Sequence, residues 1–144
     1  YLGVTYGLED GITIQDSAKE IMFSNCFVYA GRRGISDTSN GFNKFTNCLI
    51  RGDASNNANQ AAVYINSPGD KISNCDIRAN LGKGVEVTNN GDDLKLMGNF
   101  IQCLGNAIEI PAGATSTTSL GNTCRYGANS NSGGAPVVND HNVT

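Results

Sequence analysis

The chain has 144 residues, a net charge of −3 and no apolar run long enough to cross a membrane. Its charges of both signs are scattered, which argues against a nucleic-acid partner, because nucleic-acid binding requires a basic stripe. Five cysteines without a Cys-x-x-Cys pair and a single histidine, His141, argue against zinc sites and against Cys-His or Ser-His catalysis. We therefore expect one domain with no metal, no cofactor and no membrane insertion.

Two short motifs alternate along the chain. The first is a quartet that opens with a small residue and then alternates apolar and variable residues, as in a strand with one buried face. The second reads apolar, small, Asn and then a residue of buried type. The quartets occupy 11–14, 34–37, 62–65, 84–87 and 107–110, and the second motif occupies 23–28, 45–50, 72–77, 97–101 and 120–124. Together they define a repeat of about 22 to 28 residues.

A repeat of this length, with two short strands joined by Gly, Asn and Asp turns, predicts one rung of a solenoid with parallel strands. The alternation in the quartets predicts two buried rows, one of Ile12, Ile35, Val63, Val85 and Ile108 and one of Ile14, Ile65, Val87 and Ile110. Asn tolerates a left-handed backbone, and stacked amides can bond to one another. We therefore expect one corner to contain Asn25, Asn47, Asn74, Asn99 and Asn122.

The rungs cover most of the chain. We interpret 1–144 as one parallel β-helix domain and as a piece of a longer protein, with 1–10 ending a preceding rung, 11–124 forming regular rungs and 125–144 an irregular tail. The polar stretch 53–60 is expected to be a loop inserted in the second rung.

Three cysteines, Cys26, Cys48 and Cys75, occupy one repeat position directly after the Asn. Adjacent rungs are close enough for a disulfide, but we expect reduced, buried thiols, because small buried residues suit this position.

The outward residues of the quartets suggest a catalytic pair. Alternation places Glu86 beside Glu109, with Tyr64 one rung away. Carboxylates about 5 Å apart match a retaining glycosidase, and two like charges at this distance would raise one pKa, as a general acid requires. The catalytic hypothesis is Glu86 and Glu109, with Tyr64 as a sugar-stacking ring. The alternative is a solvated face on which two glutamates stack.

A second candidate site lies in the other strand series. Arg51 and Arg78 should be neighbours, with Asp76 and Asp53 close in sequence. Stacked arginines can bind acidic sugars in bidentate fashion, so we expect Arg51, Arg78 and Asp76 to bind substrate. The alternative is a surface ladder of ion pairs.

The Gly-Ile-x-Ile and Ser-Asn-Cys-x-Ile rungs from 11 to 124 resemble the pectate-lyase-like superfamily. This resemblance implies an all-β fold, a right-handed single-stranded parallel β-helix of about five to six rungs. Family members include polysaccharide lyases, galacturonases, epimerases and bacteriophage tailspikes. The acidic calcium site of the lyases and the Asp-Asp and Gly-His motifs of the galacturonases have no counterpart here.

The resemblance implies a function in polysaccharide recognition. Its closest fit is a tailspike segment of a phage virion that binds, and in one reading hydrolyses, a bacterial surface polysaccharide. A homotrimer or a longer parent chain is expected, because a short solenoid with open ends has unpaired edges. The alternatives are a secreted, extracellular polysaccharide lyase or epimerase, and a structural or adhesive β-helix without an active site.

Overall fold

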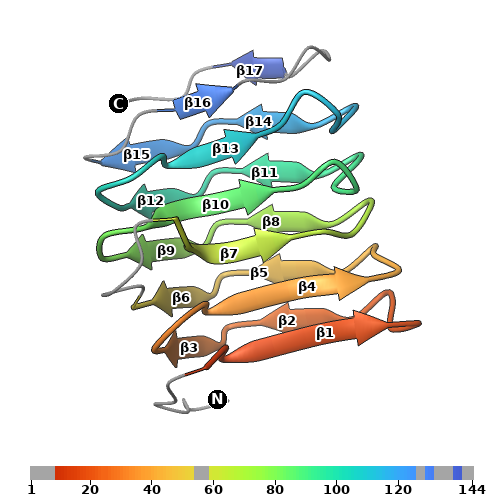
Figure 1. Ribbon diagram of the computed structural model, residues 1–144, viewed down its shortest axis with the longest axis horizontal. Coiled ribbons are helices and arrows are strands. Elements are labelled where there is room, and N and C mark those ends of the chain that lie inside the picture. Colours follow the sequence, from red (N-terminus) through yellow and green to blue (C-terminus); the bar gives the residue numbers. More distant parts are fainter. Residues whose placement is uncertain (1–8, 54–58, 126–128, 132–137, 141–144) are drawn as a thin grey trace.

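The computed structural model describes residues 9–53, 59–125, 129–131 and 138–140. The chain winds as a solenoid whose turns stack along one direction, and each complete turn passes through three parallel sheets (Figure 1). Sheet A contains β1 (Ile12–Asp16), β4 (Ile35–Ser39), β7 (Ala61–Ile65), β10 (Lys83–Val87), β13 (Ile108–Ile110) and β16 (Asn129–Asn131). Sheet B contains β2 (Met22–Ser24), β5 (Lys44–Thr46), β8 (Lys71–Ser73), β11 (Lys95–Met97), β14 (Thr118–Leu120) and β17 (Val138–Asp140). Sheet C contains β3 (Phe27–Ala30), β6 (Leu49–Gly52), β9 (Asp76–Ala79), β12 (Phe100–Gln102) and β15 (Thr123–Arg125).

Each turn has three strands, whereas we expected two from the sequence. The second motif does not form one strand, because its Asn adopts a left-handed backbone that separates sheet B from sheet C. Asn25, for example, has a φ of 54° between β2 and β3. A second left-handed residue precedes each of β2, β5, β8, β11 and β14 by two positions, at Glu20, Phe42, Gly69, Asp93 and Ser116. Two sharp bends in each turn therefore produce the three faces.

The core consists of columns of equivalent side chains. The first predicted row is confirmed, because Ile12, Ile35, Val63, Val85 and Ile108 pair in register from turn to turn. The second row contains Ile14, Ile65 and Val87, but Asp37 takes the place of an apolar residue in the second turn. In sheet B the rings of Phe23 and Phe45 stack at 5.3 Å. Asp37 therefore interrupts the second apolar row.

The expected asparagine corner is right for three copies and wrong for two. Phe100 pairs in register with Asp76 of the turn before and with Thr123 of the turn after. The residues two positions before Phe100 and Thr123 are Gly98 and Gly121, which therefore align with the left-handed residues Asn25, Asn47 and Asn74. Asn99 and Asn122 therefore belong to the next column, which continues Cys26, Cys48 and Cys75. Glycine adopts positive φ at no steric cost, so the bend does not require an asparagine in the later turns.

This mixed column forms a buried ladder. Asn99 Nδ2 donates to Ile72 O at 3.0 Å and Asn122 Nδ2 donates to Leu96 O at 3.1 Å. The thiols of Cys48 and Cys75 make the equivalent bonds to Phe23 O and Phe45 O, at 3.7 and 3.6 Å. Cys75, Asn99 and Asn122 also each accept a backbone N–H from the column residue of the previous turn. Thiol and amide thus play the same donor and acceptor roles.

The five cysteines are free thiols. Cys48 and Cys75 are buried as expected, whereas Cys26, in the first described turn, is only half-buried. The hydrogen bond with Cys48, together with burial, raises the pKa of Cys75, and burial raises the pKa of Cys103 to about 11. A raised thiol pKa leaves little thiolate, so Cys75 and Cys103 are structural groups rather than nucleophiles.

A buried polar network occupies the bend between sheets A and B. Asn43 Nδ2 donates to Asp37 Oδ2 at 2.8 Å, while the Asn43 N–H donates to Asp70 Oδ1 at 2.8 Å. Ser39 and Ser67 donate to Asp37 and Asp70 respectively. Burial raises the pKa of Asp70 to about 7, and the nearby carboxylate of Asp37 adds to the shift. These hydrogen bonds give each carboxylate buried partners, but the two carboxylates lie close together in the interior.

The C-terminal part differs from the irregular tail expected over 125–144. Arg125 ends β15, β16 pairs with β13, and β17 pairs with β14. The described part of this segment therefore continues sheets A and B. Residues 1–8, most of the 53–60 loop (54–58) and His141 lie outside the described residues.

The ladder gives a first prediction. Asn99→Ala should lower the free energy of unfolding by about 2–4 kcal/mol, because it leaves the Cys75 N–H buried without a partner and removes the amide bonds to Ile72 O and Asn122 Oδ1. Asn99→Cys should lower it by about half as much, since a thiol makes both bonds in the neighbouring turns. Urea unfolding measures the difference, and Asn74→Gly, at an exposed left-handed position, is the control with little change. Equal losses of unfolding free energy in Asn99→Ala and Asn99→Cys would show that a thiol does not replace the amide in this column.

The buried carboxylates give a second prediction. A folded-state pKa of about 7 for Asp70 lies above the unfolded value, so the folded state binds more protons between about pH 4 and 7. The stability that Asp70 contributes is present at low pH and lost as the pH rises through 7. We expect Asp70→Asn to reduce the fall in unfolding free energy between pH 5 and pH 8 by about 2 kcal/mol. Chemical denaturation at both pH values tests this, and an unaltered pH dependence would contradict it.

Candidate functional site

The outward face of sheet A carries the residues that the sequence singled out. Glu86 pairs in register with Glu109 on one side and with Tyr64 on the other. They point outward because Val85 and Val87, their neighbours in β10, are buried in the core. The neighbour relation expected from strand alternation is confirmed, while the catalytic and binding roles of these residues stay predictions.

A lysine that sequence reasoning missed lies between the two glutamates. Lys83 Nζ donates to Glu86 Oε1 and to Glu109 Oε1, each at 2.7 Å. The two carboxylate oxygens therefore lie within twice that distance of each other. Asn106 Nδ2 donates to Glu109 Oε2 at 2.8 Å. The side chains of Lys83, Glu86 and Glu109 are 15%, 21% and 29% exposed, so the cluster is mostly shielded from water.

The electrostatics of this cluster differ from our expectation of a raised carboxyl pKa. The hydrogen bond from Lys83 lowers the pKa of Glu109, against the opposing effect of burial, and the bond from Asn106 adds to the lowering. Burial alone would lower the pKa of Lys83, but its bonds to Glu109 and Glu86 raise it. The lysine thus relieves the repulsion that would have protonated one carboxylate, and at neutral pH Glu109 is a carboxylate and Lys83 an ammonium ion.

Tyr64 is covered on one side by a second missed cation. The Arg33 guanidinium carbon lies 4.1 Å from the centre of the Tyr64 ring. Arg33 Nε is buried and makes no hydrogen bond to the described residues. This cation–π contact therefore replaces polar partners for Arg33.

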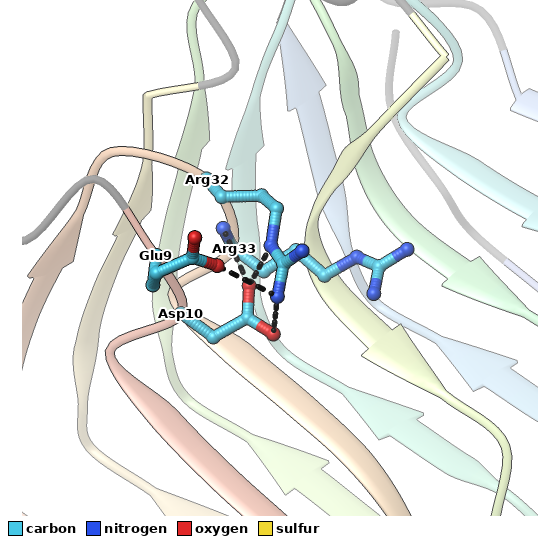
Figure 2. Close-up of polar contacts among 4 residues, drawn as sticks. All are labelled: Glu9, Asp10, Arg32 and Arg33. Atoms are coloured by element: carbon cyan, nitrogen blue, oxygen red, sulfur yellow. Dashed lines mark hydrogen bonds and ion pairs between the residues drawn. The ribbon is translucent and has the colours of Figure 1, made fainter.

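The backbone of Arg33 is held by a carboxylate cluster. The Arg33 N–H donates to Asp10 Oδ1 at 3.2 Å, and Arg32 binds both oxygens of Asp10 at 2.7 and 2.9 Å. Arg32 also contacts Glu9 at 3.2 Å. Figure 2 shows that the Arg33 side chain extends away from this cluster, whereas Arg32 folds onto it. The acidic pair thus fixes the bend from which Arg33 reaches Tyr64.

A simple sequence signal could have found these residues. Arg33, Lys83 and Asn106 each stand directly before the small residue that opens a quartet. They lie at the bend that leads into sheet A, so a long side chain there can lie over the outward row.

The second predicted site lies on the outward face of sheet C. Arg51 and Arg78 pair in register, as expected. Arg78 binds Asp76 in bidentate fashion at 2.9 and 2.6 Å, which matches the ion-pair alternative. The Arg51 guanidinium lies 5.0 Å from the Tyr29 ring, and the Tyr29 hydroxyl donates to Asp53 at 3.3 Å. A surface pocket of about 170 Å³ is lined by Arg51, Arg78, Ala79, Asn80 and Gln102.

The two predicted sites are on different faces. Tyr64, Glu86 and Glu109 project from sheet A, whereas Asp76 and the two arginines project from sheet C. The structure therefore does not combine them into one site. Within the described ranges no group of three or more His, Cys, Asp and Glu side chains is placed to bind a metal, and no helix is long and apolar enough to cross a membrane.

Comparison with known proteins gives the family. The model of the right-handed β-helix region matches residues 4–144, nearly the whole chain. The chain therefore belongs to the right-handed β-helix family, as an all-β parallel solenoid of about five turns. Domains of this family are often carbohydrate-binding or carbohydrate-processing. No curated protein and no solved structure matches the chain significantly.

The role of Lys83 gives a third prediction. Lys83→Met removes the cation from between two carboxylates, so the pKa of Glu109 should rise above its usual range, by roughly one unit or more. Carboxyl ¹³C shifts followed by NMR through a pH titration measure the change in each glutamate. Lys19→Met removes the same charge from an exposed position elsewhere and is the matched control. An unchanged Glu109 titration in Lys83→Met would mean that Lys83 does not set the charge of the pair.

Proposed function

We propose that the chain binds a bacterial surface polysaccharide along the outward face of sheet A. The observation that carries this proposal is the row of Tyr64, Glu86 and Glu109 on successive turns, with Arg33, Lys83 and Asn106 placed over it. Carboxylates, an amide and cations can bond to sugar hydroxyls, and the tyrosine edge offers an apolar contact. The rigid sheet holds these groups at the strand spacing, so little order is lost on binding.

Binding is favoured over cleavage by the charge state of the pair. A general acid must be protonated near neutral pH, but Lys83 keeps the pKa of Glu109 low. Lys83 itself is a poor base, because its pKa is raised. Hydrolysis at Glu86 and Glu109 is the second candidate, which one observation favours: their Oε1 atoms share a single ammonium group and are therefore close enough for a retaining mechanism.

The biological setting that we propose is a phage tailspike, assembled as a homotrimer or as part of a longer chain. Five free cysteines support it over an exported protein, because disulfides form readily in oxidising compartments. A secreted polysaccharide lyase or epimerase and an adhesive β-helix without an active site are the competing assignments. Arg51, Arg78 and Asp76 remain candidates for a second contact with an acidic sugar, since they line or flank the sheet C pocket.

The proposal is tested by a glycan array followed by affinity measurement on the best ligand. Tyr64→Ala should weaken binding about tenfold or more, which corresponds to about 1.4 kcal/mol. Asp16→Asn, at the end of β1, changes an exposed acidic residue outside the site and should bind normally. Normal affinity in Tyr64→Ala would move the binding face away from sheet A.

Release of reducing ends from the same glycan separates binding from hydrolysis. If the glutamates are catalytic, Glu86→Gln and Glu109→Gln should each slow release by a factor of about 100 or more and leave affinity intact. If wild-type protein binds the glycan but releases no reducing ends, the catalytic assignment is wrong and the binding function stands.

A further inference from the structure

A row of three lysines follows the outward face of sheet B. Lys44 in β5 pairs in register with Lys71 in β8, and Lys71 pairs with Lys95 in β11. Their strand neighbours Phe45, Ile72 and Leu96 are fully buried, so the lysines point outward. Paired residues on neighbouring strands are about 4.8 Å apart, which places three ammonium groups in line along the solenoid axis.

The row lacks the counter-charges that three other cations of the fold have. Arg32, Arg78 and Lys83 each form an ion pair with a carboxylate. Among the described residues, no carboxylate lies within ion-pair distance of Lys44, Lys71 or Lys95. Like charges directly opposite on neighbouring strands destabilise a sheet. The described fold supplies no carboxylate to this row, and an anionic partner would supply that counter-charge.

An exposed aromatic ring lies beside the row. Phe42 is 54% exposed although its φ of 61° is a left-handed conformation that costs about 1–2 kcal/mol. A Cβ at Gly69 would lie 2.6 Å from Phe42 Cδ1, so the glycine of the next turn makes room for the ring. A surface pocket of about 430 Å³ here is lined by Glu20, Met22, Phe42, Lys44 and Gly69. The left-handed backbone recurs at this bend in the other turns, so the exposed aromatic ring, and not the backbone conformation, distinguishes this position.

We propose that this face binds a linear anionic polysaccharide that runs along the solenoid axis. One sugar ring stacks on Phe42 and Met22, and acidic groups on the following sugars bind Lys44, Lys71 and Lys95. The regular spacing of the lysines suits a polymer with a repeated charge. The Phe42 and Met22 side chains in the pocket suit the C–H face of a sugar. Sheet B is not sheet A, so this proposal is independent of the function proposed above.

The experiment measures binding of polygalacturonate by calorimetry at low and high salt. The variant Lys44→Gln/Lys71→Gln/Lys95→Gln should lose at least tenfold in affinity, and wild-type binding should weaken as salt rises. The matched single variants are Lys71→Gln, expected to weaken binding, and Lys19→Gln, expected to bind normally. The triple variant should fold with an unchanged or higher melting temperature, because it removes like-charge repulsion. Wild-type affinity in a folded triple variant would overturn the proposal.

Two further arms identify the class of ligand. Phe42→Asn keeps a residue that tolerates the left-handed backbone, and it should weaken binding of polygalacturonate but not of polyglutamate, which has no sugar ring to stack. Equal effects on the two polymers, or tighter binding of a DNA oligonucleotide than of polygalacturonate, would overturn the polysaccharide assignment. The triple lysine variant should keep its affinity for the glycan that binds sheet A, which separates this face from sheet A.

Discussion

The parallel backbone pairing of each turn with the next is the constraint on which the rest of the structure depends. Residues such as Ile35, Val63 and Val85 bond in register, so every side chain lies directly against its equivalents in the turns before and after it. The equivalent side chains of successive turns must therefore be compatible with one another as well as with the rest of the core. Apolar side chains meet this condition by packing, whereas a buried polar column meets it only if each member bonds to the next.

The ladder shows how that condition permits a change of chemistry within one column. Cys75 and Asn99 adjoin each other, and each donates to a carbonyl of the previous turn and accepts an N–H from it. The first turns use thiols beside a left-handed Asn, and the later turns use amides beside a left-handed Gly. Asn74-Cys75 in one turn is thus replaced by Gly98-Asn99 in the next, and the strand register does not change. That exchange explains why aligning the asparagines by sequence alone placed Asn99 and Asn122 one position out.

Much of the solenoid could be predicted because the strand period acts on each residue separately. The apolar row from Ile12 to Ile108 and the juxtaposition of Glu86 with Glu109 follow from alternation and repeat length. Lys83 and Arg33 could not be placed, since they lie at bends, where the direction of a long side chain depends on its neighbours. Asp37 was missed for a different reason: alternation does not reveal that a buried carboxylate is stabilised there by hydrogen bonds from Ser39 and Asn43, two and six residues further on.

The same constraint gives the three faces different electrostatics. Repetition stacks like charges, and each face must then deal with their repulsion. Sheet A does so internally, because Lys83 at a bend reaches between Glu86 and Glu109. Sheet C does so within a strand, where Arg78 binds Asp76 two residues away. On sheet B, no carboxylate among the described residues pairs with Lys44, Lys71 or Lys95. The repulsion between these lysines therefore remains in the free protein. The anionic ligand that we propose for this face would neutralise the row and relieve this repulsion, a gain that an isolated lysine does not offer.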